Sequence, residues 1–228
     1  MREVILSVKD LNLTVKGKNL LENINFSIDK GEYLAISGIC GSGKSILIKS
    51  LLGIVTAGLT GEIHYHNIGK DEVTYIPQNI LDIKDDFIGS TKEIVAIGLL
   101  SKLKGRCMTE ESWVKVDEIL ELLNLSEVKD KKINKLSHWQ QFKVKIARHL
   151  IIDPKLIFID SPSSTSNTKL KNELYKVLKD ICNNRNTTII HITQEVKGIS
   201  PFADKLLFLN KNDNSFYFGD IKNYIPTK

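Results

Sequence analysis

Two patterns of apolar residues run along the chain and predict its strands and helices. Near the N-terminus apolar and polar side chains alternate, as expected for strands that bury one face. The alternation covers residues 4–8 and 11–15, which we expect to pair as a hairpin, and it returns at residues 24–28. The consecutive apolar residues at 33–37 are typical of a strand that is buried on both faces.

Three more apolar runs of this kind follow, at residues 156–159, 187–192 and 205–209. Segments with a helical period lie between the runs, and this order predicts an α/β fold with a parallel sheet. We expect helices at 44–52, 139–151 and 170–181, and further strands at 61–66 and 73–76.

A long helical stretch interrupts the alternation of strands and helices. From residue 91 to about residue 135 apolar residues recur at helical spacing, for example Val116, Ile119, Leu120 and Leu123. The 228 residues are enough for one substantial domain. We therefore predict a single domain over residues 1–228, with an α-helical subdomain inserted at about residues 88–148.

Composition narrows the classes of protein that fit this pattern. Hydrophobic residues make up 42% of the chain, but no stretch of about twenty apolar residues exists, so we expect no membrane span. The N-terminus lacks the apolar core of a signal peptide, which favours a cytoplasmic protein. The three cysteines are widely spaced and suit reduced thiols. Aromatic residues are not interleaved with basic ones, so we expect no nucleic acid as a partner.

Residues 38–45 (GICGSGKS) match the phosphate-binding pattern G-x-x-x-x-G-K-[ST] in full. The match lies between a predicted buried strand and a predicted helix, which is the context that confirms such a loop. Its glycines let the backbone N–H groups turn toward phosphate oxygens at a helix N-terminus. Lys44 can reach the β- and γ-phosphates, and the hydroxyl of Ser45 can bind Mg²⁺. The predicted phosphate-binding residues are Gly38, Gly41, Ser42, Gly43, Lys44 and Ser45.

Asp160 directly follows the apolar run at 156–159. A carboxylate at the end of a buried strand, beside the strand of the phosphate-binding loop, suits an aspartate that holds Mg²⁺ through water. The alternative is a helix N-cap, because Asp caps helices well. Beside a phosphate-binding loop, the metal role is the better interpretation.

Further motifs resemble those of the ATP-binding subunits of ABC transporters, over essentially the whole chain. Residues 75–78 (YIPQ) resemble the Q-loop, whose glutamine, here Gln78, contacts the metal and the attacking water in that family. Residues 136–140 (LSHWQ) occupy the place of the LSGGQ signature, and residues 161–164 (SPSS) that of Glu-Pro-Thr-Ser. The segments at 87–100, 102–106, 113–125 and 207–220 look most like those of bacterial zinc and manganese importers.

The resemblance implies a P-loop NTPase fold with a RecA-like parallel core, an antiparallel β lobe and an inserted helical subdomain. It implies ATP and Mg²⁺ as cofactors, with Ser45, Gln78 and Asp160 serving the metal. The implied partners are transmembrane permease subunits and a second nucleotide-binding subunit, in a homodimer or a heterodimer. The implied location is the cytoplasmic side of the membrane, as a peripheral subunit.

The chain departs from the family at its catalytic positions. The family's general base is a glutamate after the Walker B aspartate, and here it is Ser161, a neutral hydroxyl without an evident activating partner. The family's switch histidine aligns with Gln194, which can hydrogen-bond a phosphate but cannot carry charge. His191 lies within the preceding strand, where a structural role is the default interpretation. General-base assistance is typically worth about 10²–10⁴-fold, so we expect slow hydrolysis.

The signature and the adenine contact are altered as well. His138 and Trp139 replace the two signature glycines, and such side chains should obstruct the backbone's approach to the γ-phosphate held by the opposite subunit. Asn167 aligns with the D-loop aspartate, and Val15 with the aromatic that stacks on adenine. Glu195 is the spare carboxylate nearest in sequence to the switch position. Any dimer containing this chain would therefore have two damaged sites.

Three functions remain open at this point. The first is the ATP-binding subunit of a zinc or manganese importer, with slow or partner-dependent turnover. The second is a nucleotide-binding pseudoenzyme with a regulatory role, and the third is a soluble ABC ATPase that acts on nucleic acid or ribosomes. A zinc-binding protein proper has weaker support, because His64 and His66 lack a third ligand. We take the first as the family role and the second as the alternative mechanism.

Overall fold

The computed structural model describes residues 3–78, 89–103, 105, 107–161, 167–211 and 215–225. The chain divides into two compact units, Met1–Val73 with Lys155–Lys228, and Thr74–Pro154. The second unit contains most of the predicted helical stretch, and the division into one domain and a subdomain stays a prediction. Some residues of the family-like motifs lie outside the described residues, namely 87–88, 104, 106, 162–164 and 212–214.

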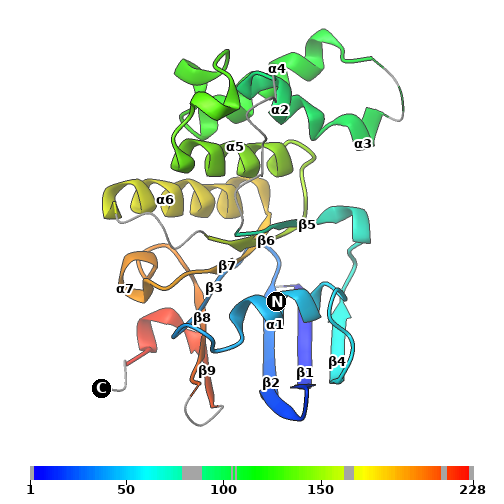
Figure 1. Cartoon of the computed structure of the whole chain (residues 1–228), viewed down its shortest axis with the longest axis vertical. Coiled ribbons are helices and arrows are strands. Elements are labelled where there is room, and N and C mark those ends of the chain that lie inside the picture. Colours follow the sequence, from blue (N-terminus) through cyan, green and yellow to red (C-terminus); the bar gives the residue numbers. More distant parts are fainter. Residues whose placement is uncertain are drawn as a thin grey trace. The chain divides into compact units, whose positions relative to one another are not determined.

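The first unit contains an antiparallel sheet of β1 (Val4–Val15), β2 (Lys18–Asp29) and β4 (Leu59–Tyr65), in the order β2-β1-β4 (Figure 1). The predicted hairpin between residues 4–8 and 11–15 is wrong, because both segments belong to the single strand β1. Asp10 adopts a left-handed φ of 49°, and the register shifts there, so a bulge absorbs the break in alternation. The true hairpin turns at Lys16 and Gly17, whose φ angles of 50° and 73° suit a two-residue turn.

A larger sheet in the same unit carries the four predicted buried runs. Its strands β6, β7, β3 and β8 lie next to each other in this order and are parallel. Every residue of β3, β6 and β7 is buried, which explains their continuous apolar sequence. The bounds are β3 (Tyr33–Gly38), β6 (Leu156–Asp160), β7 (Thr188–Ile192) and β8 (Lys205–Leu209). An unpredicted strand, β9 (Phe216–Asp220), pairs antiparallel with β8, and β5 (Val73–Ile76) lies at the boundary of the units.

Helices follow the strands of the sheet in the first unit and dominate the second. The helices of the first unit are α1 (Lys44–Leu51), α6 (Thr168–Arg185) and α7 (Val196–Ile199). Those of the second are α2 (Thr91–Ile97), α3 (Leu100–Leu103), α4 (Glu110–Leu122) and α5 (His138–Leu150). Helices α2, α4 and α5 pack against one another through fully buried side chains such as Val95, Ile119 and Ile146. The predicted helices at 44–52, 139–151 and 170–181 correspond to α1, α5 and α6.

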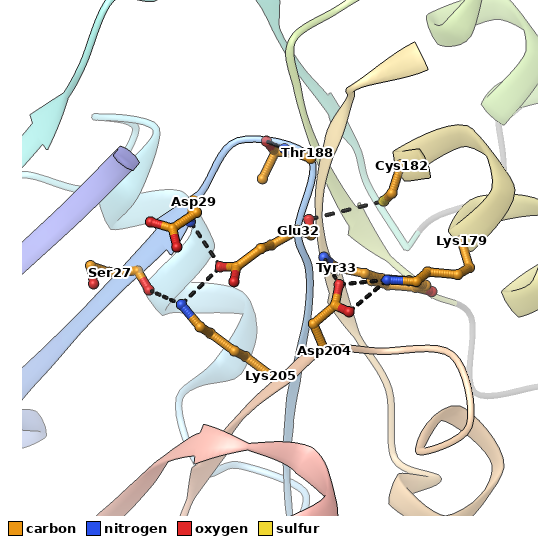
Figure 2. Close-up of polar contacts among 10 residues, drawn as sticks. Ser27, Asp29, Glu32, Tyr33, Lys179, Cys182, Thr188, Asp204 and Lys205 are labelled. Carbon is orange, nitrogen blue, oxygen red and sulfur yellow. Dashed lines mark hydrogen bonds and ion pairs between the residues drawn. The ribbon is translucent and has the colours of Figure 1, made fainter. Parts of the chain in front are cut away.

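Two ion pairs fix the beginning of β3 (Figure 2). Glu32, which is 4% exposed, accepts from Nζ of Lys205 at 2.8 Å. On the other side of the strand, Asp204 accepts from the backbone N–H of Tyr33 at 2.9 Å and from Nζ of Lys179 at 2.6 Å. Both acidic groups are thereby compensated by a charge and by hydrogen bonds, as partly buried carboxylates require. The strand that ends at the phosphate-binding loop is therefore held firmly at its opposite end.

Candidate functional site

Residues 38–45 form a tight loop between β3 and α1, and two glycines are indispensable to its shape. Gly38 has a φ of 143°, and a Cβ there would lie 2.3 Å from the carbonyl oxygen of Leu209. Gly43 has a φ of 92°, and a Cβ there would lie 2.9 Å from a methyl group of Leu21. The loop leads into α1, whose first N–H groups have no partners within the helix. This geometry makes a cradle for an anion at the helix N-terminus.

The ammonium group of Lys44 lies over this cradle. The residue is 8% exposed, and its Nζ donates to the carbonyl oxygens of Gly38 and Ile39, both at 2.8 Å. A longer contact of 3.3 Å joins Nζ to the hydroxyl of Ser42. Burial lowers the pKa of Lys44, because its ammonium has lost water and these three oxygens carry no charge. An anion in the loop would supply the missing counter-charge.

Ser45 and Asp160 meet at the carboxyl end of the sheet. The hydroxyl of Ser45 donates to Oδ2 of Asp160 at 2.8 Å. Asp160 ends β6, is 4% exposed and caps no helix; the N-cap of α6 is Asn167, which accepts from the N–H of Leu170. Burial raises the pKa of Asp160, and the Ser45 hydroxyl and the Lys44 ammonium offset only part of that effect. A hydroxyl beside a carboxylate is a donor set that suits Mg²⁺, so these residues fit a metal-bound triphosphate.

Ser161 has a partner that the sequence did not reveal. Its hydroxyl is hydrogen-bonded to Nε2 of His191, and Nδ1 of the same ring is hydrogen-bonded to the Tyr33 hydroxyl at 2.6 Å. Tyr33 and His191 are both fully buried, and burial lowers the pKa of His191 to about 3. Ser161 therefore has a hydrogen-bond partner, but a buried imidazole with so low a pKa does not activate the hydroxyl as a base, so the expectation of slow hydrolysis stays a prediction. The interpretation of His191 as a satisfied strand histidine is confirmed, and the signal was a lone histidine in an apolar run.

The other polar residues at the family's catalytic positions have surroundings of their own. Gln194 is exposed in the connection between β7 and α7, and its catalytic role stays a prediction. Glu195 is turned toward α6, where its carboxylate pairs with Nζ of Lys171 at 3.2 Å. Gln78 is exposed just after β5 and belongs to the second unit, so its service to the metal also stays a prediction.

The altered signature forms the N-terminus of α5. Ser137 is the N-cap: its hydroxyl accepts from the N–H of Gln140 at 3.2 Å, and the Gln140 side chain accepts from the N–H of Ser137 at 2.9 Å. His138 and Trp139 occupy the first turn, with His138 exposed. The Trp139 ring packs on Phe142, with 5.8 Å between ring centroids. The capped helix N-terminus is thus present, and bulky side chains stand where the family has glycines.

Lys211 is a site residue that the motifs did not indicate. Its Nζ lies 3.2 Å from the position that a Cβ on Gly41 would take, which places a second ammonium at the phosphate-binding loop. No carboxylate in the described ranges pairs with it. Lys211 comes from the connection after β8, so only the folded sheet brings it to Gly41. Val15 ends β1 beside the hairpin turn, and its contact with adenine stays a prediction.

The described residues add nothing to the idea of a zinc-binding protein. His64 pairs with Glu62 at 3.1 Å, and His66 is hydrogen-bonded to Ser7 at 2.8 Å. Within the described ranges, no three His, Cys, Asp or Glu side chains are grouped so that they could hold a metal. None of the helices that the structure describes has the length and apolar character needed to cross a bilayer.

Comparisons with known proteins agree with this geometry. The family model described as ABC transporter matches residues 21–164. The high-affinity zinc uptake system ATP-binding protein ZnuC of Bacillus subtilis (strain 168) is 28% identical over 213 residues, which cover 92% of each chain. The molybdate/tungstate import ATP-binding protein WtpC of Methanocaldococcus jannaschii is 32% identical over 197 residues, which cover 83% of this chain and 63% of that protein.

A solved structure extends the agreement to the fold. The structure of cbiO1 from Clostridium perfringens, part of the ABC transporter complex cbiONQ, has a TM-score of 0.81 at 25% identity. The similarity covers 96% of this chain and 90% of that chain. The predicted fold class, a P-loop core with a mostly parallel sheet and an antiparallel sheet, is confirmed.

Proposed function

Because the chain belongs to the ABC transporter family, we propose that it is the ATP-binding subunit of a zinc importer that holds ATP with Mg²⁺ and hydrolyses it slowly. The observation that carries this proposal is the arrangement of Lys44, Ser45 and Asp160 at one end of the sheet. A buried ammonium, a hydroxyl and a buried carboxylate meet there at a helix N-terminus. These are the groups that contact phosphates and magnesium in P-loop proteins.

Slow hydrolysis follows from the residue after Asp160. The Ser161 hydroxyl is not a base near neutral pH, and its partner His191 is buried and resists protonation because burial lowers its pKa to about 3. Neither group can accept a proton usefully from the attacking water. The loss of general-base assistance is worth about 10²–10⁴-fold in rate. The second candidate function, a nucleotide-binding regulatory protein without turnover, rests on this same observation.

The proposed cargo rests on how fully the relatives match. The zinc proteins ZnuC of Bacillus subtilis and AdcC of Streptococcus pneumoniae match over 92% of both chains. WtpC of Methanocaldococcus jannaschii has the higher identity of 32% but matches over only 63% of its own length. MolC of Haemophilus influenzae, named for molybdate import, matches over 85% of its length at 29% identity. We therefore propose zinc as the cargo and molybdate as the competing outcome.

The same proposal names the partners. An importer needs a membrane pathway, and none of the described helices can span a bilayer, so we propose transmembrane permease subunits as partners. We also propose a second nucleotide-binding subunit and a location at the inner face of the membrane.

Isothermal titration of the purified chain tests nucleotide binding, and phosphate release measured alone and with the co-encoded permease tests turnover. We expect ATP binding that depends on magnesium and is lost in Lys44→Ala, because the ammonium that donates to the loop carbonyls is removed. Retained affinity in that variant would refute the phosphate assignment. For the cargo, a deletion strain should fail to grow when zinc is chelated and recover with added zinc; recovery with molybdate instead would reject zinc.

A further inference from the structure

The hydrogen bonds of Tyr33, His191 and Ser161 form a chain through the sheet, and two of its three members have no exposed surface. Tyr33 begins β3 and His191 lies in β7, where the parallel register places Ile189 beside Tyr33 and His191 beside Ile159 of β6. The hydroxyl of Tyr33 contacts Nδ1 at 2.6 Å, and Nε2 contacts the hydroxyl of Ser161. Tyr175 covers the ring edge-on, with 5.5 Å between centroids.

Which atom donates in each of these hydrogen bonds follows from the need to give every buried donor an acceptor. The Tyr33 hydroxyl stays protonated, because burial raises its pKa well above the usual value. In the described part of the molecule, Nδ1 of His191 is the one acceptor within reach of that proton. The opposite order would leave a buried O–H without an acceptor, which costs about 1–3 kcal/mol. The Tyr33 hydroxyl therefore donates to Nδ1.

The positions of the remaining protons in this row of hydrogen bonds then follow. A neutral imidazole has one N–H and one acceptor nitrogen, so an Nδ1 that accepts leaves the proton on Nε2. The Nε2–H donates to the oxygen of Ser161. The Ser161 hydroxyl proton is consequently not used by His191 and can be donated elsewhere.

We propose that His191, held by Tyr33, is a positioning residue that fixes the Ser161 hydroxyl as a hydrogen-bond donor to the terminal phosphate of a bound nucleoside triphosphate. The inference rests on the proposed function, since it requires a nucleotide in the loop. Ser161 directly follows Asp160, whose carboxylate meets the Ser45 hydroxyl at the predicted magnesium site. If Ser45 and Asp160 held the magnesium of a bound nucleotide, its terminal phosphate would lie near this end of β6, where Ser161 follows Asp160.

This assignment gives Ser161 a role opposite to that of a general base. A general base accepts the proton of the attacking water, whereas a hydroxyl held in this way gives its proton to an anionic oxygen. Donors to charged oxygens form stronger hydrogen bonds than donors to neutral ones. The hydrogen bonds of Tyr33, His191 and Ser161 thus favour the binding of ATP over that of ADP. They do nothing to activate water.

Nucleotide affinities of matched variants test the proposal. In Ser161→Ala, the dissociation constant for Mg·ATP should rise about tenfold while that for ADP stays unchanged, the size typical of losing a hydrogen bond to a charged group. His191→Gln should keep the preference for ATP, because the side-chain amide can place an N–H near the position of Nε2. His191→Asn reaches only as far as Nδ1, so it should lose the preference to the same extent as Ser161→Ala. Circular dichroism and melting curves establish that each variant is folded.

The tautomer of His191 provides a readout on the unaltered protein. Nitrogen NMR with ¹⁵N-labelled histidine should show the Nε2–H form, with the His191 signals identified as those missing in His191→Gln among the five histidines. An Nδ1–H tautomer would overturn the proposal, because Ser161 would then donate to His191. Equal losses of ATP and ADP affinity in Ser161→Ala would overturn it as well. If the wild-type chain binds no Mg·ATP, the proposed function itself fails.

Discussion

Replacement of Asp160 by asparagine should stabilise the nucleotide-free protein and abolish its response to magnesium. The carboxylate of Asp160 is 4% exposed and accepts the Ser45 hydroxyl at 2.8 Å. Burial raises its pKa, which means that desolvation outweighs the favourable contacts of the charged form with Ser45 and Lys44. At neutral pH the folded protein therefore carries a carboxylate that destabilises it. Asparagine removes the charge and keeps an acceptor oxygen for Ser45.

The sign and the size of the effect follow from linkage. A carboxyl group whose pKa is raised on folding destabilises the fold only where it is ionised, so the penalty is absent below the unfolded pKa of about 4. The penalty grows as the pH rises from the unfolded pKa to the folded pKa, and it is constant above the folded pKa. Each 1 kcal/mol of such a penalty corresponds to about 2–4 °C in Tm for a chain of this length. Asp160→Asn should thus melt a few degrees higher at pH 7, and the difference should shrink toward pH 4.

Melting curves with and without Mg·ATP complete the test, with Asp71→Asn as the control because Asp71 is exposed. Ligand at about one hundred times its dissociation constant stabilises the wild type by about 2.7 kcal/mol, or roughly 5–10 °C. The variant lacks the carboxylate that we propose holds the metal, so Mg·ATP should stabilise it much less than it stabilises the wild type. The stability order should therefore invert when Mg·ATP is added. A variant that melts below the wild type without nucleotide, or an equal magnesium effect in both proteins, would refute the reasoning.

Three further substitutions probe the loop, its support and the altered base. Lys211→Ala should weaken ATP binding about two- to fivefold, in a salt-dependent way, because an exposed ammonium contributes up to about 1 kcal/mol. Isothermal titration measures this, with Lys169→Ala as the control. An equal loss of ATP affinity in the two variants would contradict the prediction. Lys205→Ala removes the ammonium that pairs with the buried carboxylate of Glu32, so urea unfolding should show a loss of about 3–5 kcal/mol that added Glu32→Gln partly restores. Ser161→Glu should raise phosphate release by less than about tenfold, because the switch and signature positions remain altered; a gain of 10² or more would contradict this expectation.

The sequence predicts those parts of the molecule whose signal is local. The central strands are buried on both faces, so each is a continuous apolar run that can be recognised without its neighbours. The phosphate-binding loop is equally local, since its shape depends on glycines such as Gly38 and Gly43 within one short segment. The predicted bounds of β5 and β8, residues 73–76 and 205–209, are the observed ones.

What could not be predicted depends on pairings between distant segments. Strand β1 continues through Asp10 because a bulge against β2 accommodates the break in alternation. Strand β9 is only half-buried and pairs with β8, and its aromatic run at 216–218 is shorter than the apolar runs of the central strands. Lys211 meets Gly41, and His191 meets Ser161, only after the parallel sheet has formed. Such contacts depend on which residues of neighbouring strands lie side by side, and a single sequence does not reveal that register.

The altered positions share a chemical feature that bears on the choice between importer subunit and regulatory protein. Where the family has a glutamate and a histidine, this chain has Ser161 and Gln194, which are neutral and can still donate hydrogen bonds. Such replacements remove groups that transfer protons and leave groups that can donate to phosphate oxygens, and the proton order that we propose for Tyr33, His191 and Ser161 would direct the serine proton outward. ATP affinity and ATP turnover should therefore be uncoupled in this chain. An importer must reset its nucleotide site in each cycle, so a permease that fails to accelerate phosphate release would decide for the regulatory protein.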